Sequence, residues 1–472
     1  MKPLFALALL TGGALAATPT YNRDIAPLLY ENCAGCHRPG QVAPFSLLTY
    51  QDAAKRAAQI ATVTAGRYMP PWKAELGYGH FQNERRLSDA QIALIREWAS
   101  HGAPEGDPKQ KPAPPEFASG WLAGKPDAVL TLPKPFEIPA DGRDIFQCFV
   151  IPMDFGAQRY VKTVEFHPGN AKVVHHALFF LDISGEARRL AGESPGGGYP
   201  CFGGPRIMPA GGLGGWAPGA IPHALPAGIG YVIEKGADLV IQLHYHPDGK
   251  PESDQSSIGL TFTEESSKGL TNFTVGARRL DLAAGDAHYE VKEWGIIPQD
   301  VELIGITPHA HLLCKDMKVD AVYPDGRTES LIWIKDWDFN WQGQYRYVTS
   351  IELPKGTRIE MRYVYDNSEN NPHNPSHPPR RVKFGEQTTD EMGFAFLQVA
   401  LARREDVPGF RRSMVLSRIE TMIREGDDFS TLNPRQAANL RRAVAVFDKN
   451  HDGKLDPEEL AALMQFLQGS VK

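Results

Sequence analysis

Between residues 125 and 402 the chain is a series of short runs in which apolar and polar residues alternate, separated by Gly, Pro, Asp and Asn. A period of two is typical of strands that bury one face. The clearest runs are residues 145–151, 173–180, 236–245, 301–307, 358–365 and 393–399. This spacing predicts antiparallel β-sandwiches rather than βαβ units. Roughly 275 residues is enough for two sandwiches in tandem, and we expect a break near residues 266–272.

Both ends of the chain have helical patterns instead. Residues 21–32 and 88–100 are predicted helices, and Ser88 is the expected N-cap of the second. That helix has an apolar face made of Ile92, Leu94, Ile95 and Trp98. Helices are also expected at residues 434–446 and 457–467. The predicted fold is therefore mainly β, with two tandem antiparallel sandwiches between an N-terminal and a C-terminal α-helical segment.

These patterns divide the chain into six parts. Residues 102–119 are rich in Pro, Lys and Glu and are typical of an extended linker. The expected parts are a signal peptide (1–17), an N-terminal helical domain (18–105), a linker (106–124), a first β-sandwich (125–268), a second β-sandwich (269–405) and a helical segment (406–472).

Composition and the N-terminus predict the compartment. The 472 residues are 42% hydrophobic and 22% charged, and the formal net charge of −6, with no basic stripe, argues against a nucleic-acid partner. The start, Met1-Lys2, precedes an apolar run at residues 4–10 and small residues that suit cleavage after Ala16 or Ala17. The alternative is the frayed first helix of a cytosolic protein. No stretch is long enough to span a membrane, so we expect a periplasmic or secreted protein.

The sequence Cys33-Ala-Gly-Cys36-His37 has the spacing of a c-type haem attachment site. Two thiols two residues apart can add to the haem vinyl groups, and the next histidine then faces the iron. A zinc site would need a second Cys/His pair nearby, and a thioredoxin-like motif would need a βαβ setting. Neither is present, so the N-terminal helical domain is predicted to be a cytochrome.

The sixth ligand of this haem iron is predicted to be Met69. It lies in Tyr68-Met69-Pro70-Pro71-Trp72, where prolines hold a rigid turn. His/Met ligation raises the haem potential. The alternatives are that Met69 is an ordinary core residue, or that His80 or His101 binds the iron.

Four further clusters have the residue types of a redox metal site. Neutral imidazole suits copper, zinc and iron, and a thioether favours a soft ion such as Cu(I). Each cluster lies in a run that is typical of a β-strand, so the imidazoles are expected to project from a rigid sheet. The clusters are His175-His176, Gln242-Leu-His244-Tyr-His246, His309-Ala-His311 and Asp390-Glu391-Met392.

Strand geometry decides which of these side chains can share an ion. Side chains two apart on a strand share a face, so His309 and His311 can reach one metal. Neighbours such as His175 and His176 normally point to opposite faces. Binding of one ion by both requires a β-bulge or an edge position.

The order of these clusters resembles that of the copper type II, ascorbate-dependent monooxygenases, the peptidylglycine α-hydroxylating and dopamine β-monooxygenase enzymes. The resemblance covers residues 126–405 and includes the strand 236–245 and the stretch from Tyr363-Val-Tyr-Asp-Asn to Phe384-Gly-Glu. It implies two jelly-roll domains, each with one copper, that face each other across a cleft. It also implies O2 as co-substrate and ascorbate or another one-electron reductant.

Residue by residue, the resemblance implies two ligand sets. The first copper, which supplies electrons, would be held by His175, His176 and His244. The second, where O2 reacts, would be held by His309, His311 and Met392. His246 has no family counterpart and is either a strand histidine or a residue that supports a ligand.

The resemblance further implies a disulfide between Cys148 and Cys201, whereas Cys314 matches no family cysteine and is expected to be a buried thiol. One position departs from the family. Where the peptide-amidating enzymes have an arginine that binds the substrate carboxylate, this chain has Thr307. A neutral or aromatic small molecule is therefore the expected substrate.

The C-terminal segment contains an EF-hand loop of twelve residues, with glycine at its sixth position (Gly453). The carboxylate at position twelve can bind Ca²⁺ through both oxygens, and position seven binds through its backbone carbonyl. The expected ligands are Asp448, Asn450, Asp452, Lys454, Asp456 and Glu459. The alternative is a solvated acidic turn. No second such loop is evident in residues 405–432.

Together these features predict an exported copper monooxygenase with a fused cytochrome c domain. Its cofactors would be two copper ions, haem c and calcium. Its partners would be a small-molecule substrate, O2 and a one-electron donor. The alternatives are a non-oxygenating copper and haem protein of electron transfer or metal binding, and a β scaffold that binds no copper.

Overall fold

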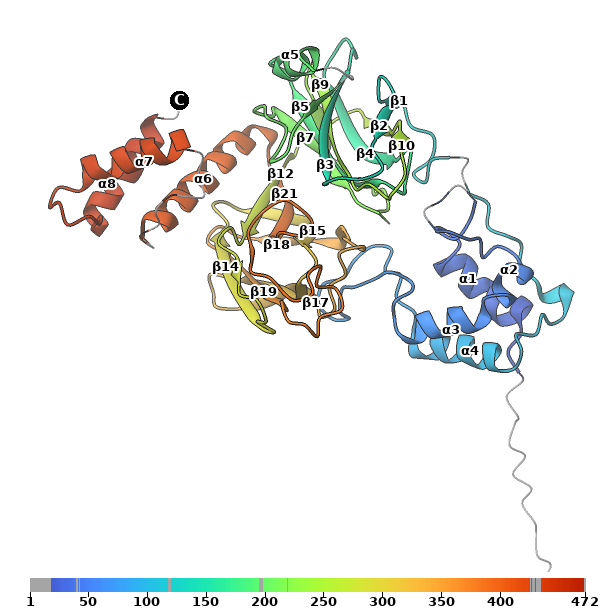
Figure 1. The fold of residues 1–472 in the computed structure, drawn as a ribbon. Coiled ribbons are helices and arrows are strands. Elements are labelled where there is room, and N and C mark those ends of the chain that lie inside the picture. Colours follow the sequence, from blue (N-terminus) through green and yellow to red (C-terminus); the bar gives the residue numbers. More distant parts are fainter. Residues whose placement is uncertain are drawn as a thin grey trace, which may run out of the picture. The chain divides into compact units, whose positions relative to one another are not determined.

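The computed structural model describes residues 18–470, except 40, 42, 118–119, 195–197, 219, 425, 427–428 and 430–433. The predicted signal peptide lies outside the described residues. The chain forms two compact units (Figure 1). The helical unit comprises Met1–Trp72 and Arg85–Glu116, and the β unit comprises Lys73–Glu84 and Phe117–Lys472.

The helical unit contains the two helices that the sequence predicts near the N-terminus. Its elements are η1 (Tyr21–Ile25, a π-helix), α1 (Ala26–Asn32), α2 (Tyr50–Ala54), α3 (Ala57–Ala65), α4 (Asp89–Ser100) and the 3₁₀ turn η2 (Pro108–Gln110). Ser88 caps α4 as predicted, because its hydroxyl accepts from Gln91 N and its own N–H donates to Gln91 Oε1. Tyr21, Leu29 and Trp98 are fully buried in the core of this unit.

The first sheet pair of the β unit consists of the strands before residue 264. They are β1 (Ala128–Thr131), β2 (Phe136–Ile138), β3 (Ile145–Pro152), β4 (Arg159–His167), β5 (Val174–Asp182), β6 (Gly198–Pro200), β7 (Gly211–Trp216), β8 (Tyr231–Ile233), β9 (Asp238–Tyr245), β10 (Glu252–Asp254) and β11 (Ser257–Thr263), with α5 (Glu186–Gly192) after β5. A four-stranded sheet, β1-β11-β4-β8, faces a five-stranded sheet, β6-β3-β9-β5-β7, and β10 pairs with β2.

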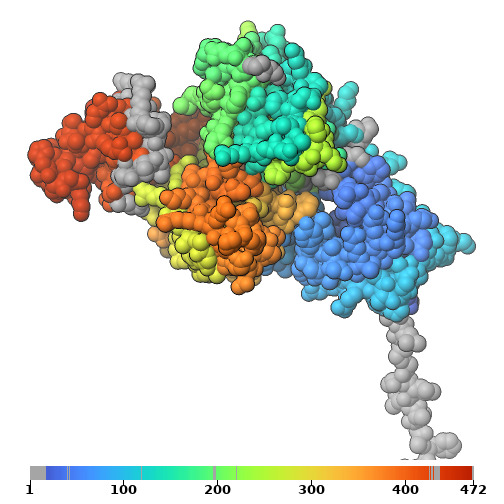
Figure 2. Space-filling model, in the orientation of Figure 1, coloured from blue at the N-terminus to red at the C-terminus, as the bar shows by residue number. Residues whose placement is uncertain are grey.

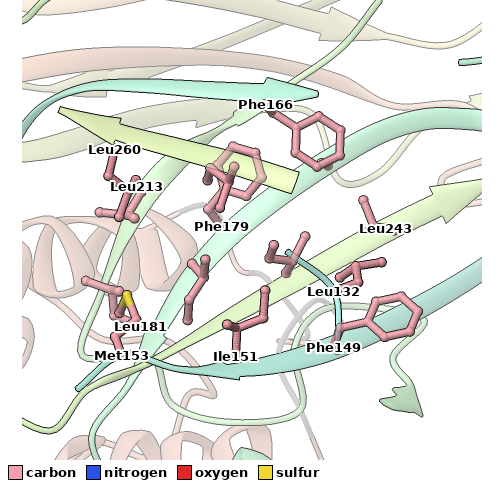
Figure 3. Packing of buried hydrophobic residues seen from close by; sticks show 14 of the residues in the cluster. Leu132, Phe149, Ile151, Met153, Phe166, Phe179, Leu181, Leu213, Leu243 and Leu260 are labelled. Carbon is pink, nitrogen blue, oxygen red and sulfur yellow. The ribbon is translucent and has the colours of Figure 1, made fainter. Parts of the chain in front are cut away.

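One apolar core holds these two sheets together. Figure 3 shows Phe149, Leu243 and Phe179 of the five-stranded sheet packed with Phe166 and Leu260 of the other sheet. Strand β9 lies in the middle of its sheet, and all eight of its residues are buried. A side chain on β9 is therefore held on a rigid, dry support.

The second sheet pair repeats this arrangement with the later strands. They are β12 (Gly269–Gly276), β13 (Asp281–Leu282), β14 (Tyr289–Ile296), β15 (Val301–Ala310), β16 (Cys314–Val322), β17 (Thr328–Ile334), β18 (Tyr345–Leu353), β19 (Arg358–Tyr365), β20 (Val382–Lys383) and β21 (Gly393–Leu401). The sheets are β12-β21-β15-β18 and β14-β19-β16-β17, and β13 pairs with β20. In Figure 2 the orange and yellow atoms of this pair lie against the green and teal atoms of the first. Gln398 donates to Tyr231 Oη across this boundary at 2.8 Å.

Residues 73–84, here called the strap, belong to the β unit although they lie between two parts of the helical unit in sequence. The strap runs beside β18, the edge strand of its sheet. Gln82 N donates to the Arg346 carbonyl at 2.8 Å, and Val348 N donates to the His80 carbonyl at 2.9 Å. The buried ring of Phe81 lies 5.0 Å from that of Tyr347. The strap thereby covers a sheet edge that would otherwise present unpaired backbone groups.

The C-terminal elements are the 3₁₀ turn η3 (Arg404–Asp406) and the helices α6 (Val407–Arg424), α7 (Pro434–Phe447) and α8 (Pro457–Ser470). The last two confirm the predicted helices. The long helix α6 contacts both neighbours: Phe410 and Arg411 are on the part near β12, where Arg411 bonds to Thr271, and Leu416 packs against Leu460 and Met464 of α8.

The predicted fold class is confirmed at the level of a mainly β chain with antiparallel sheets and helices at both ends. The disulfide between Cys148 and Cys201 is also confirmed, and it joins β3 to the residue after β6. Cys314 is a buried free thiol, as expected, and burial raises its pKa well above the ordinary value. In the part of the chain that the structure describes, no helix is long and apolar enough to cross a membrane.

Candidate metal centres

Three predicted ligands converge in the first sheet pair. His175 and His176 lie on β5 and His244 lies on β9, and one ring nitrogen from each falls within 4.8 Å of the other two. The Nδ1 atom of His176 is 3.2 Å from Nδ1 of both His175 and His244. Two nitrogens bound tetrahedrally to one ion at about 2.0 Å are roughly 3.3 Å apart. We call these three residues the first cluster, and its spacing suits a single metal ion.

A β-bulge brings the two adjacent histidines together. Val174 pairs with Tyr245 and His176 pairs with His244, so two steps along β5 correspond to one step along β9. His175 is the extra residue in this bulge. The sequence required such an irregularity for both imidazoles to bind one ion, and the bulge supplies it.

Asp144 supports the first cluster from the residue before β3. Its carboxylate lies 3.1 Å from His244 Nε2 and accepts a hydrogen bond from His246 Nδ1 at 2.8 Å. Burial alone would raise the pKa of Asp144, but the contacts with His244, Thr388 and His246 outweigh burial and hold it well below its ordinary value. A carboxylate in this place fixes a ring so that its other nitrogen, here Nδ1, faces the ion. Nothing in the sequence around Asp144 indicated this role.

We call the predicted set His309, His311 and Met392 the second cluster. His309 lies in β15, His311 follows directly after that strand, and Met392 directly precedes β21. The pairing of the two strands ends with His309 opposite Phe394 and Ala310 opposite Gly393, next to His311 and Met392 in sequence. The two imidazole centroids are 5.4 Å apart and their planes are nearly perpendicular, at 83°.

Both histidines of the second cluster have one ring nitrogen engaged. His309 Nδ1 donates to Gln342 Oε1 at 2.7 Å, and His311 Nδ1 donates to the Asp390 carbonyl at 3.1 Å. In each ring Nε2 is then the atom left to bind a metal. The sequence predicted the ligands but not Gln342, which lies in a loop far along the chain.

Glu391 connects the adjoining ends of β15 and β21, the two strands beside the second cluster. It is fully buried and accepts backbone hydrogen bonds from His311, Met392 and Leu313. Burial raises the pKa of Glu391 to about 8, although the three N–H donors partly offset that rise. The sequence singled out this residue only as a neighbour of Met392.

Four imidazoles of the two clusters are in the neutral form that binds metals. Burial and neighbouring imidazoles together lower the pKa of His175 and of His311 to about 3. Burial also lowers the pKa of His176 and His309. Neutral imidazole is the ligand form, so these four rings need no deprotonation near neutral pH.

The predicted haem site lies in the helical unit. Cys33 and Cys36 are both free thiols, and burial raises the pKa of Cys33 to about 12. His37 Nδ1 donates to the Phe45 carbonyl at 3.1 Å, which leaves Nε2 free to face an iron. The three residues therefore fit a covalent haem. Met69 is half-buried in this unit and precedes a cis bond to Pro70.

The two alternative haem ligands have other surroundings. His101 is exposed at the end of α4, where its Nδ1 donates to the Glu97 carbonyl at 2.8 Å. His80 is part of the strap and hence of the β unit.

The EF-hand loop folds as a cation site would require. Gly453 has a φ of +83°, which suits the sharp turn at position six. Asp448 and Glu459 are buried, and no other described residue offers a hydrogen-bond partner to Asp448 Oδ1. Glu459 accepts from Lys449 N and Asp456 N, which orients its carboxylate. Buried carboxylate oxygen without a partner fits Ca²⁺.

Comparisons with known proteins do not identify a family. No protein-family model and no curated protein matches the chain. Solved structures give weak likenesses. The major capsid protein P2 of bacteriophage PM2 is 8% identical over 58% of this chain and 96% of its own, with a TM-score of 0.24. The VP2 subviral particle protein of infectious bursal disease virus is 11% identical over 61% and 75%, with a TM-score of 0.16. These scores are too low to support an inference.

Proposed function

We propose that this chain is an exported copper-dependent monooxygenase that hydroxylates a C–H bond of a small organic substrate. The convergence of His175, His176 and His244 on one point is the observation that supports it most. A second pair of histidines lies on the other sheet pair, at the end where Met392 precedes β21, and Met392 would add the thioether that favours Cu(I). This is the ligand order on which the resemblance to the copper type II, ascorbate-dependent monooxygenases rests. We equate their two jelly-roll domains with the two sheet pairs.

The proposed overall reaction consumes a substrate C–H bond, O2, two electrons and two protons, and yields the alcohol and water. Bound copper would supply the one-electron redox chemistry and the activation of O2. The protein holds the rings in place for that purpose. Asp144 fixes His244, and Gln342 fixes His309, so that unprotonated nitrogens face each ion. No acid–base pair is needed, so we assign none.

We also propose that the helical unit is a c-type cytochrome that relays electrons from ascorbate or another one-electron donor. Cys33 and Cys36 would attach the haem, and His37 and Met69 would be its axial ligands. A donor joined to the acceptor by the same chain has a raised effective concentration. The EF-hand loop would bind Ca²⁺ as a structural ion.

An aromatic pair beside the second cluster supports a neutral or aromatic substrate, although the Arg278 guanidinium lies 5.0 Å from the centroid of one of these rings, that of Phe394. Phe394 lies opposite His309 and Phe396 lies opposite Thr307, and the two phenyl rings are stacked with centroids 5.6 Å apart. A neutral or aromatic small molecule suits such a surface better than a carboxylate does. The disulfide between Cys148 and Cys201 supports a periplasmic or secreted location, where such bonds persist.

Elemental analysis of the purified chain, with a haem spectrum, is the first experiment. We expect two copper ions, one haem and one calcium per chain. O2 consumption coupled to hydroxylated product, with ascorbate as reductant, should then be lost in Met392→Ala. The matched control is Met208→Ala, because Met208 is 87% exposed.

Two outcomes would contradict the proposal. Copper at both clusters without coupled product, over a broad panel of neutral and aromatic substrates, would favour a non-oxygenating electron-transfer protein. Haem without copper, even after reconstitution, would remove the oxygenase altogether.

A further inference from the structure

One loop of the second sheet pair contacts ligands of both clusters. Residues 335–344, here called the cross-loop, connect β17 to β18. Trp337 Nε1 donates to the carbonyl of His311 at 3.0 Å, and Gln342 accepts from His309. The cross-loop therefore holds both histidines of the second cluster, one through its backbone and one through its ring.

Phe339, near the middle of the cross-loop, also reaches the first cluster. Its ring is stacked on that of His175, with centroids 4.7 Å apart and planes 24° from parallel. The same ring meets His311 edge-on, with centroids 5.7 Å apart and an angle of 76°. The imidazoles of His175 and His311 can be no farther apart than the sum of these two distances. One phenyl ring thus separates a ligand of each cluster.

Other bonds join the two sheet pairs around this ring. Gln344, also in the cross-loop, donates to the Gly215 carbonyl at 2.8 Å. Gly203 N donates to Glu386 at 2.6 Å. These bonds hold the sheet pairs together, but among the described contacts Phe339 is the one side chain that stacks against both clusters.

We propose that Phe339 is a positioning residue that sets the spacing between the first and second clusters of proposed ligands. The part of this inference that concerns metal ions rests on the proposed function. The contacts of the Phe339 ring with His175 and His311 do not depend on it. Contact of Phe339 with His175 fixes how closely the first cluster approaches the second. An electron that passes between the clusters would cross a distance set by this side chain.

Histidine resonances test the geometry in the full chain before copper is added. In protein labelled with ¹³C-histidine, the stacked ring should shift the signals of His175 and His311 by its ring current. In Phe339→Leu both signals should move, whereas His373 should not. Phe339→Tyr keeps the ring and should restore both. Phe466→Leu, which removes an exposed ring from α8, is the matched control. If neither cluster signal moves, or only one does, the inference is wrong.

Electron paramagnetic resonance of the chain loaded with two Cu(II) ions tests the spacing. The wild-type spectrum should show dipolar broadening from two ions close together. The broadening should change in Phe339→Leu at unchanged copper content and stay as in the wild type in Phe339→Tyr. An unchanged spectrum in Phe339→Leu would overturn the spacing role. If no copper binds but both histidine signals move, the proposed function fails while the bridging geometry stands.

Discussion

The hydroxyl of Thr388 donates a hydrogen bond to Asp144, a residue of the other sheet pair, and Asp144 also lies 3.1 Å from Nε2 of the proposed ligand His244. One buried carboxylate therefore joins the two sheet pairs and orients a ring of the first cluster. A change at the boundary between the sheet pairs would therefore alter the orientation of the His244 ring.

Replacement of Asp144 by Asn should weaken copper binding at the first cluster about 10- to 100-fold, because loss of a partner that orients a ligand has effects of that size. The second cluster should keep its affinity. Competition with a Cu(I) chelator measures both. Asp141→Asn is the control, since Asp141 is exposed three residues away. Equal losses at both clusters, or no loss, would contradict the assigned role of Asp144.

Calcium should stabilise the C-terminal helices. Ca²⁺ at a hundred times its dissociation constant adds about 2.7 kcal/mol to the free energy of unfolding of the loop and its helices. The thermal midpoint of this segment should rise on addition of Ca²⁺, and Glu459→Gln should abolish the rise. Glu458→Gln should not, because Glu458 is exposed and outside the ligand set. An equal response in both variants would argue for the solvated acidic turn.

Acid should destabilise the first sheet pair through Glu165. This buried residue accepts from His167 and from the backbone of Leu122 and Ala123. Burial would raise its pKa, but these bonds outweigh burial and lower the pKa below the ordinary value of 4.5. A lowered pKa in the folded state gives stability that is present above 4.5 and is lost as the pH falls through the folded-state pKa.

The test of Glu165 compares thermal midpoints at pH values of about 6 and about 3. The fall should be smaller in Glu165→Gln than in the wild type, since glutamine does not titrate. Glu137→Gln, at an exposed position of β2, should fall as the wild type does. A fall in Glu165→Gln as large as that of the wild type would show that other groups cause the acid sensitivity.

Phe81→Ala should release the strap from β18. Phe81 is 6% exposed, and deletion of a buried phenyl ring costs about 3–5 kcal/mol. Local opening of the strap should rise roughly a hundredfold to a few thousandfold, and limited trypsin digestion next to Lys73 and Arg85 should quicken accordingly. Leu76→Ala removes a side chain that is 71% exposed and should digest as the wild type does. Equal rates for the two variants would mean that Phe81 does not anchor the strap.

The strands and the flanking helices could be predicted because each depends on local pattern: alternation marks a strand, and side chains two apart on it share a face. The set of His175, His176 and His244 was expected from the family resemblance alone, because neighbours on a strand normally point to opposite faces. The bulge at His175 could be stated only as a requirement, since a bulge depends on the partner strand. Asp144, Gln342 and Phe339 could not be predicted at all. Each acts through a fold that brings distant segments together, and a lone Asp, Gln or Phe has no spacing by which to recognise it.

The strap changes how the two units are connected. The chain passes from one unit to the other after Trp72, after Glu84 and again after Glu116. A protease that cut only within residues 106–124 would divide the chain into two fragments, and the N-terminal fragment would still pair with β18 through the non-covalent contacts of the strap. Expression of residues 117–472 alone would leave β18 without its neighbour, and expression of residues 1–116 alone would leave Phe81 without its pocket. The helical unit is therefore not a detachable N-terminal module, and its exchange for another domain would have to retain residues 73–84.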